Sequence, residues 1–177
     1  MKRAQRLWPE NMTVWATHIA LCEKWNKRTQ LSKLYEEMIS RFPHNVNVWI
    51  SAAKFQLERN GSVDQARKLL LRAQQQVPTA AEIYDQLFRI ELVNSAQIVK
   101  RLNVAGGSAD SSELEPIETD VRQGAAAIGV FVFILKNYPD NYSLLFNMVV
   151  QAKSLEPQIK NVTDELTKAF MELKSGL

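Results

Sequence analysis

Apolar residues recur along most of the chain at intervals of three and four positions, which is the period of an amphipathic helix. Prolines and short polar segments separate these stretches, and a proline limits a helix because it lacks an N–H donor and its ring clashes with the preceding turn. Ser62 with Gln65 and Thr79 with Glu82 match the capping box of a helix start. The pattern predicts an all-α protein of about eight helices, over residues 11–25, 29–41, 46–58, 63–76, 80–102, 116–137, 142–155 and 158–174.

Prolines also mark an internal repeat. Four prolines each precede a large side chain by six residues, and the pairs are Pro9 and Trp15, Pro43 and Trp49, Pro78 and Tyr84, and Pro139 and Leu145. The large residues are 34, 35 and 61 positions apart. A period near 34 residues is typical of stacked helix pairs, because one pair cannot bury its apolar face alone. We therefore expect an α-solenoid of antiparallel helix pairs.

Seven positions of this repeat are predicted to pack between helices. A large ring fills the gap between the two helices of a unit, and alanine permits the close approach of two helices. The predicted core residues are Trp15, Trp49, Tyr84, Tyr35, Ala66, Ala73 and Phe131. Exposed rings that stack on RNA bases are the alternative interpretation, and the fixed position of the rings in the repeat favours the core.

The chain is expected to contain three segments. Residues 1–102 hold two full repeat units and the first helix of a third, and the long 61-residue spacing then includes an acidic stretch that is rich in Gly and Ser. That composition buries too little apolar surface to become ordered, so residues 103–115 are predicted to form a flexible loop. The acidic loop could serve as a docking strand for a partner or be merely a solvated loop, and the solvated loop is favoured. Residues 116–177 then complete the third unit and form a degenerate fourth.

The stretch from Gly124 to Leu135 is compatible with two kinds of element. Its β-branched and aromatic residues are typical of a buried strand as well as of a helix. Phe131 and Ile134 keep the spacing to Pro139 that the other units show, and the neighbouring sequence offers no partner strand. A helix is therefore predicted.

Charge is divided along the chain. Residues 1–103 hold 16 Lys and Arg against 9 Asp and Glu, net +7, and residues 104–177 hold 6 against 10, net −4. A basic half fits attraction to nucleic acid or to an acidic partner, although charge this diffuse is more typical of solvated helix faces. Candidate contact residues surround the first turn between helices, and they are Lys24, Lys27, Arg28 and Lys33.

No catalytic site, cofactor site or metal site is predicted. One cysteine and two histidines cannot supply a four-ligand metal site, and the chain has no phosphate-binding loop. His18 and Cys22 share a helix face, which suits a thiolate–imidazole pair, but the same face is the expected core stripe, and core packing is favoured. The apolar runs are too short for a membrane helix and no secretory signal is evident, so a soluble intracellular protein is expected.

The repeats resemble half-a-TPR (HAT) repeats, a class that occurs in proteins of RNA maturation. Its marks are a Trp early in the first helix, a Glu nine residues later, an Ala-Arg start of the second helix and a centre similar to Tyr-Glu-Arg-Ala. Trp49 and Glu58 match the first pair of marks. Ala66 and Arg67 match the third, and residues 35–38 or 70–73 match the fourth.

Within this class, residues 12–102 are similar to a family of small nucleolar RNA-associated proteins of the small-subunit processome. Residues 25–27, 49–58 and 88–92 carry the resemblance. It implies a non-catalytic scaffold in the nucleolus of the cell nucleus, which acts in maturation of the small-subunit rRNA. The implied partners are other processome proteins and, mostly indirectly, precursor rRNA or small nucleolar RNA.

The resemblance further implies a fragment of a longer protein, because members of that family carry an additional region before their repeats. Two alternatives stay open: a HAT-repeat scaffold in pre-mRNA splicing or 3′-end processing, and a direct RNA-binding module that uses the basic N-terminal half. Self-association is also left open.

Overall fold

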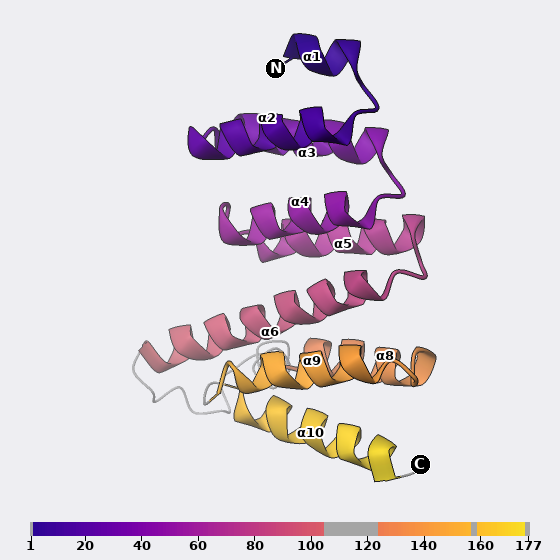
Figure 1. The fold of residues 1–177 in the computed structure, drawn as a ribbon. Coiled ribbons are helices and arrows are strands. Elements are labelled where there is room, and N and C mark those ends of the chain that lie inside the picture. Colours follow the sequence, from indigo (N-terminus) through magenta and orange to yellow (C-terminus); the bar gives the residue numbers. More distant parts are fainter. Residues whose placement is uncertain (1, 105–123, 157–158, 176–177) are drawn as a thin grey trace. The chain divides into compact units, whose positions relative to one another are not determined.

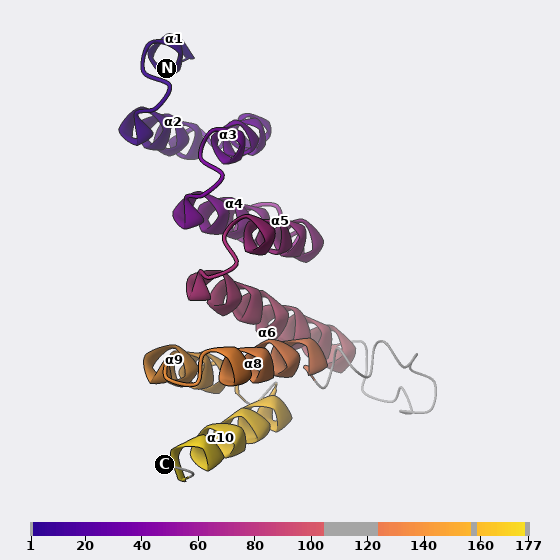
Figure 2. The same cartoon turned by 90° about the vertical axis from the view of Figure 1, so that its right-hand side faces the viewer.

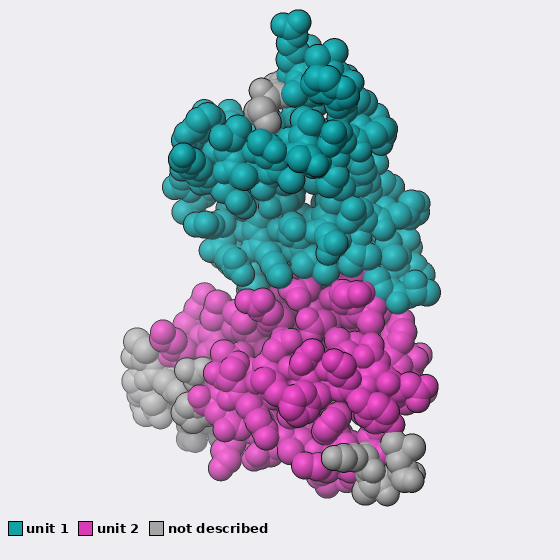
Figure 3. All heavy atoms as spheres, viewed as in Figure 1, with its two compact units in different colours: residues 1–80 teal, residues 81–177 magenta. Residues whose placement is uncertain are grey.

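The computed structural model describes residues 2–104, 124–156 and 159–175 of the chain. Every regular element in these ranges is a helix and none is a strand, which confirms the all-α prediction. The chain forms two compact units, Met1–Ala80 and Ala81–Leu177, which Figure 3 shows in different colours. Within the described ranges, no helix combines the length and the apolar character that crossing a membrane requires.

Unit 1, Met1–Ala80, is built from helices that each contact the next one along the chain. Their bounds are α1 Lys2–Leu7, α2 Met12–Lys24, α3 Arg28–Arg41, α4 Val46–Glu58 and α5 Val63–Gln76. α2 lies beside α3 and α4 lies beside α5, as Figures 1 and 2 show. These four helices agree with the predicted ranges to within one residue at each end. The short α1 was not among the predicted helices, because six residues are too few to establish a helical period.

A hydrogen bond explains the six-residue spacing from proline to tryptophan in unit 1. The indole N–H of Trp15 donates to the backbone carbonyl of Pro9 at 2.9 Å, and that of Trp49 donates to the carbonyl of Pro43 at 2.8 Å. Both rings are buried, at 7% and 2% exposed, so each indole N–H needs a protein partner. The bond ties each ring to the connection that precedes its own helix.

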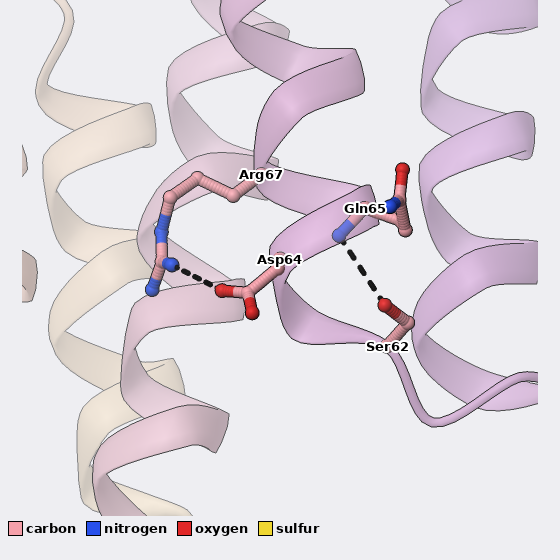
Figure 4. A network of polar contacts seen from close by, with 4 residues as sticks. All are labelled: Ser62, Asp64, Gln65 and Arg67. Carbon is pink, nitrogen blue, oxygen red and sulfur yellow. Dashed lines mark hydrogen bonds and ion pairs between the residues drawn. The ribbon is translucent and has the colours of Figure 1, made fainter.

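Polar side chains set the starts of α2, α4 and α5. Asn11 and Asn45 each accept a hydrogen bond from the backbone N–H two residues later. The Ser62 hydroxyl accepts the N–H of Gln65 at 3.3 Å, which confirms the first bond of the predicted capping box (Figure 4). The N–H of Ser62, which the box assigns to the Gln65 side chain, instead donates to the carbonyl of Gln56 at 2.9 Å. These contacts satisfy N–H groups that have no partner within the helix.

The second predicted cap, at Thr79, is wrong by one position. The following helix begins at Ala81, so Ala80 is the residue that directly precedes it.

Beyond the Ser62 cap, Arg67 pairs with Asp64 at 3.0 Å across one turn of α5 (Figure 4). This exposed ion pair stabilises the helix by only a few tenths of a kcal/mol, roughly.

Unit 2, Ala81–Leu177, has an apolar core to which four helices contribute. Their bounds are α6 Ala81–Val104, α8 Ala125–Asn137, α9 Tyr142–Lys153 and α10 Lys160–Ser175. α6 contacts α8 and α9, and α10 also contacts both of them. Phe88 of α6, Phe131 of α8 and Leu145 of α9 are completely buried in this core.

The stretch from Gly124 to Leu135 is helical where a strand was the alternative, so the helix prediction is confirmed. Phe131 and Ile134 are completely buried, whereas Val132 and Phe133 are 48% and 41% exposed. This alternation of buried and exposed residues follows the helical period.

Two predicted ranges extend beyond the described residues. The helix over 116–137 is described from Gly124 onward, and its residues 116–123 lie outside the described part of the chain. The predicted loop over 103–115 lies outside it from residue 105 onward, while Asn103 and Val104 belong to α6. The three-segment division of the chain therefore stays a prediction.

Candidate functional site

The seven residues predicted to form the repeat core are all buried, at most 7% exposed. Five of them belong to α2 to α5 around the two helix pairs of unit 1, and the ring of Tyr35 packs on that of Phe55 with centroids 5.3 Å apart. In unit 2 the ring of Tyr84 stacks on that of Phe133 at 5.1 Å. These side chains form the interior of the two units, so a binding surface must involve other residues.

The four candidate contact residues occupy two different places on unit 1, and all four are exposed. Lys24 ends α2, Lys27 precedes α3 and Arg28 begins α3, so these three surround a single turn of three residues. Lys33 lies farther along α3 and lines a pocket with Trp15 and His18. The structure therefore groups three of the four candidates and separates the fourth.

The turn between α2 and α3 also presents an aromatic ring that we did not predict as a site residue. Trp25 is 60% exposed, and the Lys27 ammonium lies over its ring, 5.5 Å from the centroid. The only sequence signal was a tryptophan among basic residues. We name Lys24, Trp25, Lys27 and Arg28 the basic turn.

Backbone hydrogen bonds fix the conformation of the basic turn. Asn26 has a left-handed backbone conformation with φ of +50°. The N–H of Asn26 donates to the carbonyl of Glu23, and the N–H of Lys27 donates to the carbonyl of Cys22. This pair of bonds is the Schellman arrangement that ends many helices, with asparagine in the place that glycine usually takes. The turn is thus a defined structure.

The pocket at Lys33 has a volume of about 340 Å³ and is formed by α1, α2 and α3. Gln5 is buried in its wall, and its Oε1 lies 3.0 Å from Nδ1 of His18. Cys22, the proposed alternative partner of His18, is buried. Among the described residues, no group of three His, Cys, Asp or Glu side chains is placed to hold a metal ion.

A groove of about 330 Å³ lies between α2 and α4, with α3 contributing to its lining. α2 contributes apolar side chains and one carboxylate, and residues around the start of α4 contribute two amides and a hydroxyl. Its lining includes Met12, Ala16, Ile19, Glu23, Tyr35, Asn45, Asn47 and Ser51. Apolar walls with a few polar groups are typical of sites that bind an extended segment.

Tyr35 is buried beside this groove, and its burial raises the pKa of the phenol to about 12, with a smaller contribution from the negative charge of Glu23. The folded protein therefore holds this proton more tightly than the unfolded chain, whose tyrosine pKa is near 10. The stabilisation is complete below about pH 10 and is lost as the pH rises toward 12.

We expect the free energy of unfolding to fall less steeply between pH 10 and pH 12 in Tyr35→Phe than in the wild type, because the variant has no proton to lose at this position. Urea unfolding at a series of pH values measures both slopes. Equal slopes in the two proteins would show that Tyr35 ionises alike in the folded and unfolded states.

Comparison with known proteins gives one consistent result. No family model matches the chain. It is 29% identical over 147 residues, 81% of its length, to the human U3 small nucleolar RNA-associated protein 6 homolog. It is 34% identical over 98 residues, 55% of its length, to the mouse protein of the same name. The matches cover 25% and 16% of these relatives, so the chain spans about a quarter of their length at most. The predicted similarity to a small nucleolar RNA-associated protein is confirmed.

Proposed function

From this similarity we propose that the chain is a non-catalytic scaffold of a pre-ribosomal RNA processing complex, the small-subunit processome of the nucleolus. The observation that carries the proposal is the similarity over 81% of the chain to a protein named for its association with U3 small nucleolar RNA. The proposed role is protein–protein contact on a helical surface during maturation of the small-subunit rRNA.

The proposed architecture is a short solenoid of HAT repeats. Two observations in unit 1 support it: α2 with α3 and α4 with α5 form successive helix pairs, and the bond from indole N–H to proline carbonyl occurs once in each pair. A recurring local bond gives successive units the same geometry, which is what stacking of helix pairs requires.

The groove between α2 and α4 is the proposed binding site for an extended segment of a partner protein. Met12, Ala16 and Ile19 offer apolar contact, and Asn47 and Ser51 offer hydrogen bonds to a peptide backbone. The carboxylate of Glu23 in the same groove favours a segment that carries a basic side chain.

Sedimentation of the tagged chain from cell extracts tests this role. We expect it to sediment with precursor ribosomal particles that contain U3 RNA. Ser51→Arg places a bulky cation in the groove and should reduce this association several-fold, whereas Gln75→Arg, at an exposed position of α5 outside the groove lining, should leave it unchanged. Sedimentation with splicing or 3′-end processing complexes would instead support the alternative scaffold, and a chain free of any particle would contradict both.

A further inference from the structure

The basic turn combines two features that the proposed scaffold role does not use. One is the exposed ring of Trp25, whose large apolar surface is costly to leave in water. The other is the set of three cations, Lys24, Lys27 and Arg28, within five consecutive positions. Both features lie on unit 1, which holds 13 Lys and Arg against 6 Asp and Glu, net +7.

We propose that the basic turn binds a short stretch of single-stranded RNA, with one base stacked on Trp25 and phosphates held by Lys24, Lys27 and Arg28. Single-stranded nucleic acid fits this surface because it supplies a flat aromatic face and negative charges a few ångströms apart on the same molecule. An acidic peptide matches the cations, but it gains little from the ring.

The ring is prepared for stacking before any ligand arrives. The Lys27 ammonium lies over the ring and restrains it, while 60% of the side chain stays exposed. The left-handed Asn26 and the two backbone bonds of the Schellman arrangement hold Trp25 and Lys27 on a rigid support. A restrained ring loses less conformational entropy on binding than a freely moving one.

The charges around the turn favour an anion. α3 is 14 residues long and begins at Arg28, with no acidic residue in its first turn and no side chain capping it, so its positive end adds to the three cations. Glu23 is the nearest acidic residue along the chain, and its carboxylate lines the groove on the side of Tyr35.

The choice of RNA over DNA rests on the proposed function, because stacking and phosphate contacts are common to both polymers. Binding to the purified chain is nevertheless measured without any particle, so the two proposals fail separately. RNA binding with no sedimentation on pre-ribosomes would remove only the processome role, and the reverse result would remove only this inference.

Fluorescence anisotropy of a labelled 12-nucleotide single-stranded RNA of mixed sequence, titrated with the full chain, tests the inference. Trp25→Ala should weaken binding about 5- to 150-fold, the range found when a stacking aromatic residue is lost. Three phosphate contacts predict a slope of about −2 in log affinity against log salt, and replacing Lys24 or Arg28 with alanine should reduce that slope by about 0.7 each.

Matched controls separate the site from general effects. Trp8→Ala removes a tryptophan of similar exposure, 57%, which lies outside the turn, and Lys33→Ala removes an exposed cation of α3 that lines the separate pocket. Both variants should bind RNA within about twofold of the wild type. Trp25→Phe keeps an aromatic face and should recover most of the affinity that Trp25→Ala loses. Circular dichroism confirms that each variant is folded.

Any of these results would overturn the inference: no RNA binding at low salt, equal losses in Trp8→Ala and Trp25→Ala, or an affinity that does not depend on salt. A polyglutamate peptide that binds the same turn more tightly than RNA, with the same loss in Trp25→Ala, would assign the surface to an acidic protein. The same titration is carried out with a labelled single-stranded DNA of the same sequence. Tighter binding of DNA than of RNA would also contradict the proposal.

Discussion

Replacing Trp49 with alanine should lower the free energy of unfolding by about 3–5 kcal/mol, the range for truncating a buried aromatic residue. The ring is 2% exposed, its N–H donates to the carbonyl of Pro43, and the guanidinium of Arg72 lies 5.5 Å from its centroid. The substitution therefore leaves a cavity, an unpaired carbonyl and a lost cation contact. Urea unfolding followed by circular dichroism measures the change, and typical domains have only about 5–15 kcal/mol to lose.

Two comparisons show which part of Trp49 matters. Trp49→Phe keeps much of the packing but removes the donor to Pro43, so it should cost about 1–2 kcal/mol. Trp25→Ala removes an exposed ring and should change stability by about 0.5 kcal/mol or less. If Trp49→Ala were as mild as Trp25→Ala, the central position of this ring in the core of unit 1 would be refuted.

Gly124→Ala should destabilise unit 2 by at least about 2 kcal/mol. The residue has φ of +69°, where an L side chain costs about 1–2 kcal/mol, and an added Cβ would overlap the side chain of Val162 on α10. The same substitution at Gly129, in the middle of α8, should stabilise by about 0.5–1 kcal/mol, because a Cβ there meets open space and alanine favours a helix.

Thermal unfolding of both glycine variants measures the contrast. Combining Gly124→Ala with Val162→Ala separates the two causes, since the smaller side chain removes the overlap but not the backbone cost. The double variant should therefore be more stable than the sum of the two single losses predicts. Strict additivity would mean that the overlap is relieved by movement of α10.

The helices were predictable because their determinants are local. Apolar residues spaced by three and four, together with the prolines, located α2 to α5 to within one residue. The same spacing decided correctly in favour of a helix around Phe131, where the residue types fitted a strand and a helix equally well. α1 is too short to give such a signal, and the shift of one residue after Thr79 lies within the fraying of helix ends.

The sites were less predictable because they depend on the direction of side chains. The six-residue spacing was visible in the sequence, but the hydrogen bonds from the indole N–H groups of Trp15 and Trp49 to proline carbonyls were not. They depend on how the backbone runs between the proline and the helix, which the sequence does not specify. Sequence also grouped Lys33 with the three cations of the basic turn, although α3 carries it into a different pocket. The proline spacing predicted burial of Trp15 and Trp49, but it gave no prediction for Trp25, which lies outside that spacing and is exposed.

The apolar composition of α8 makes unit 2 prone to aggregation when it unfolds. Residues 130–135 are all β-branched, aromatic or leucine and carry no charge, which is the signature of a segment that pairs with copies of itself in fibrils. In the folded unit this stretch is helical, with Phe131 and Ile134 locked in the core. Loss of the α8 contacts therefore releases an aggregation-prone segment, so packing around Phe131 protects the protein against self-assembly as well as against unfolding.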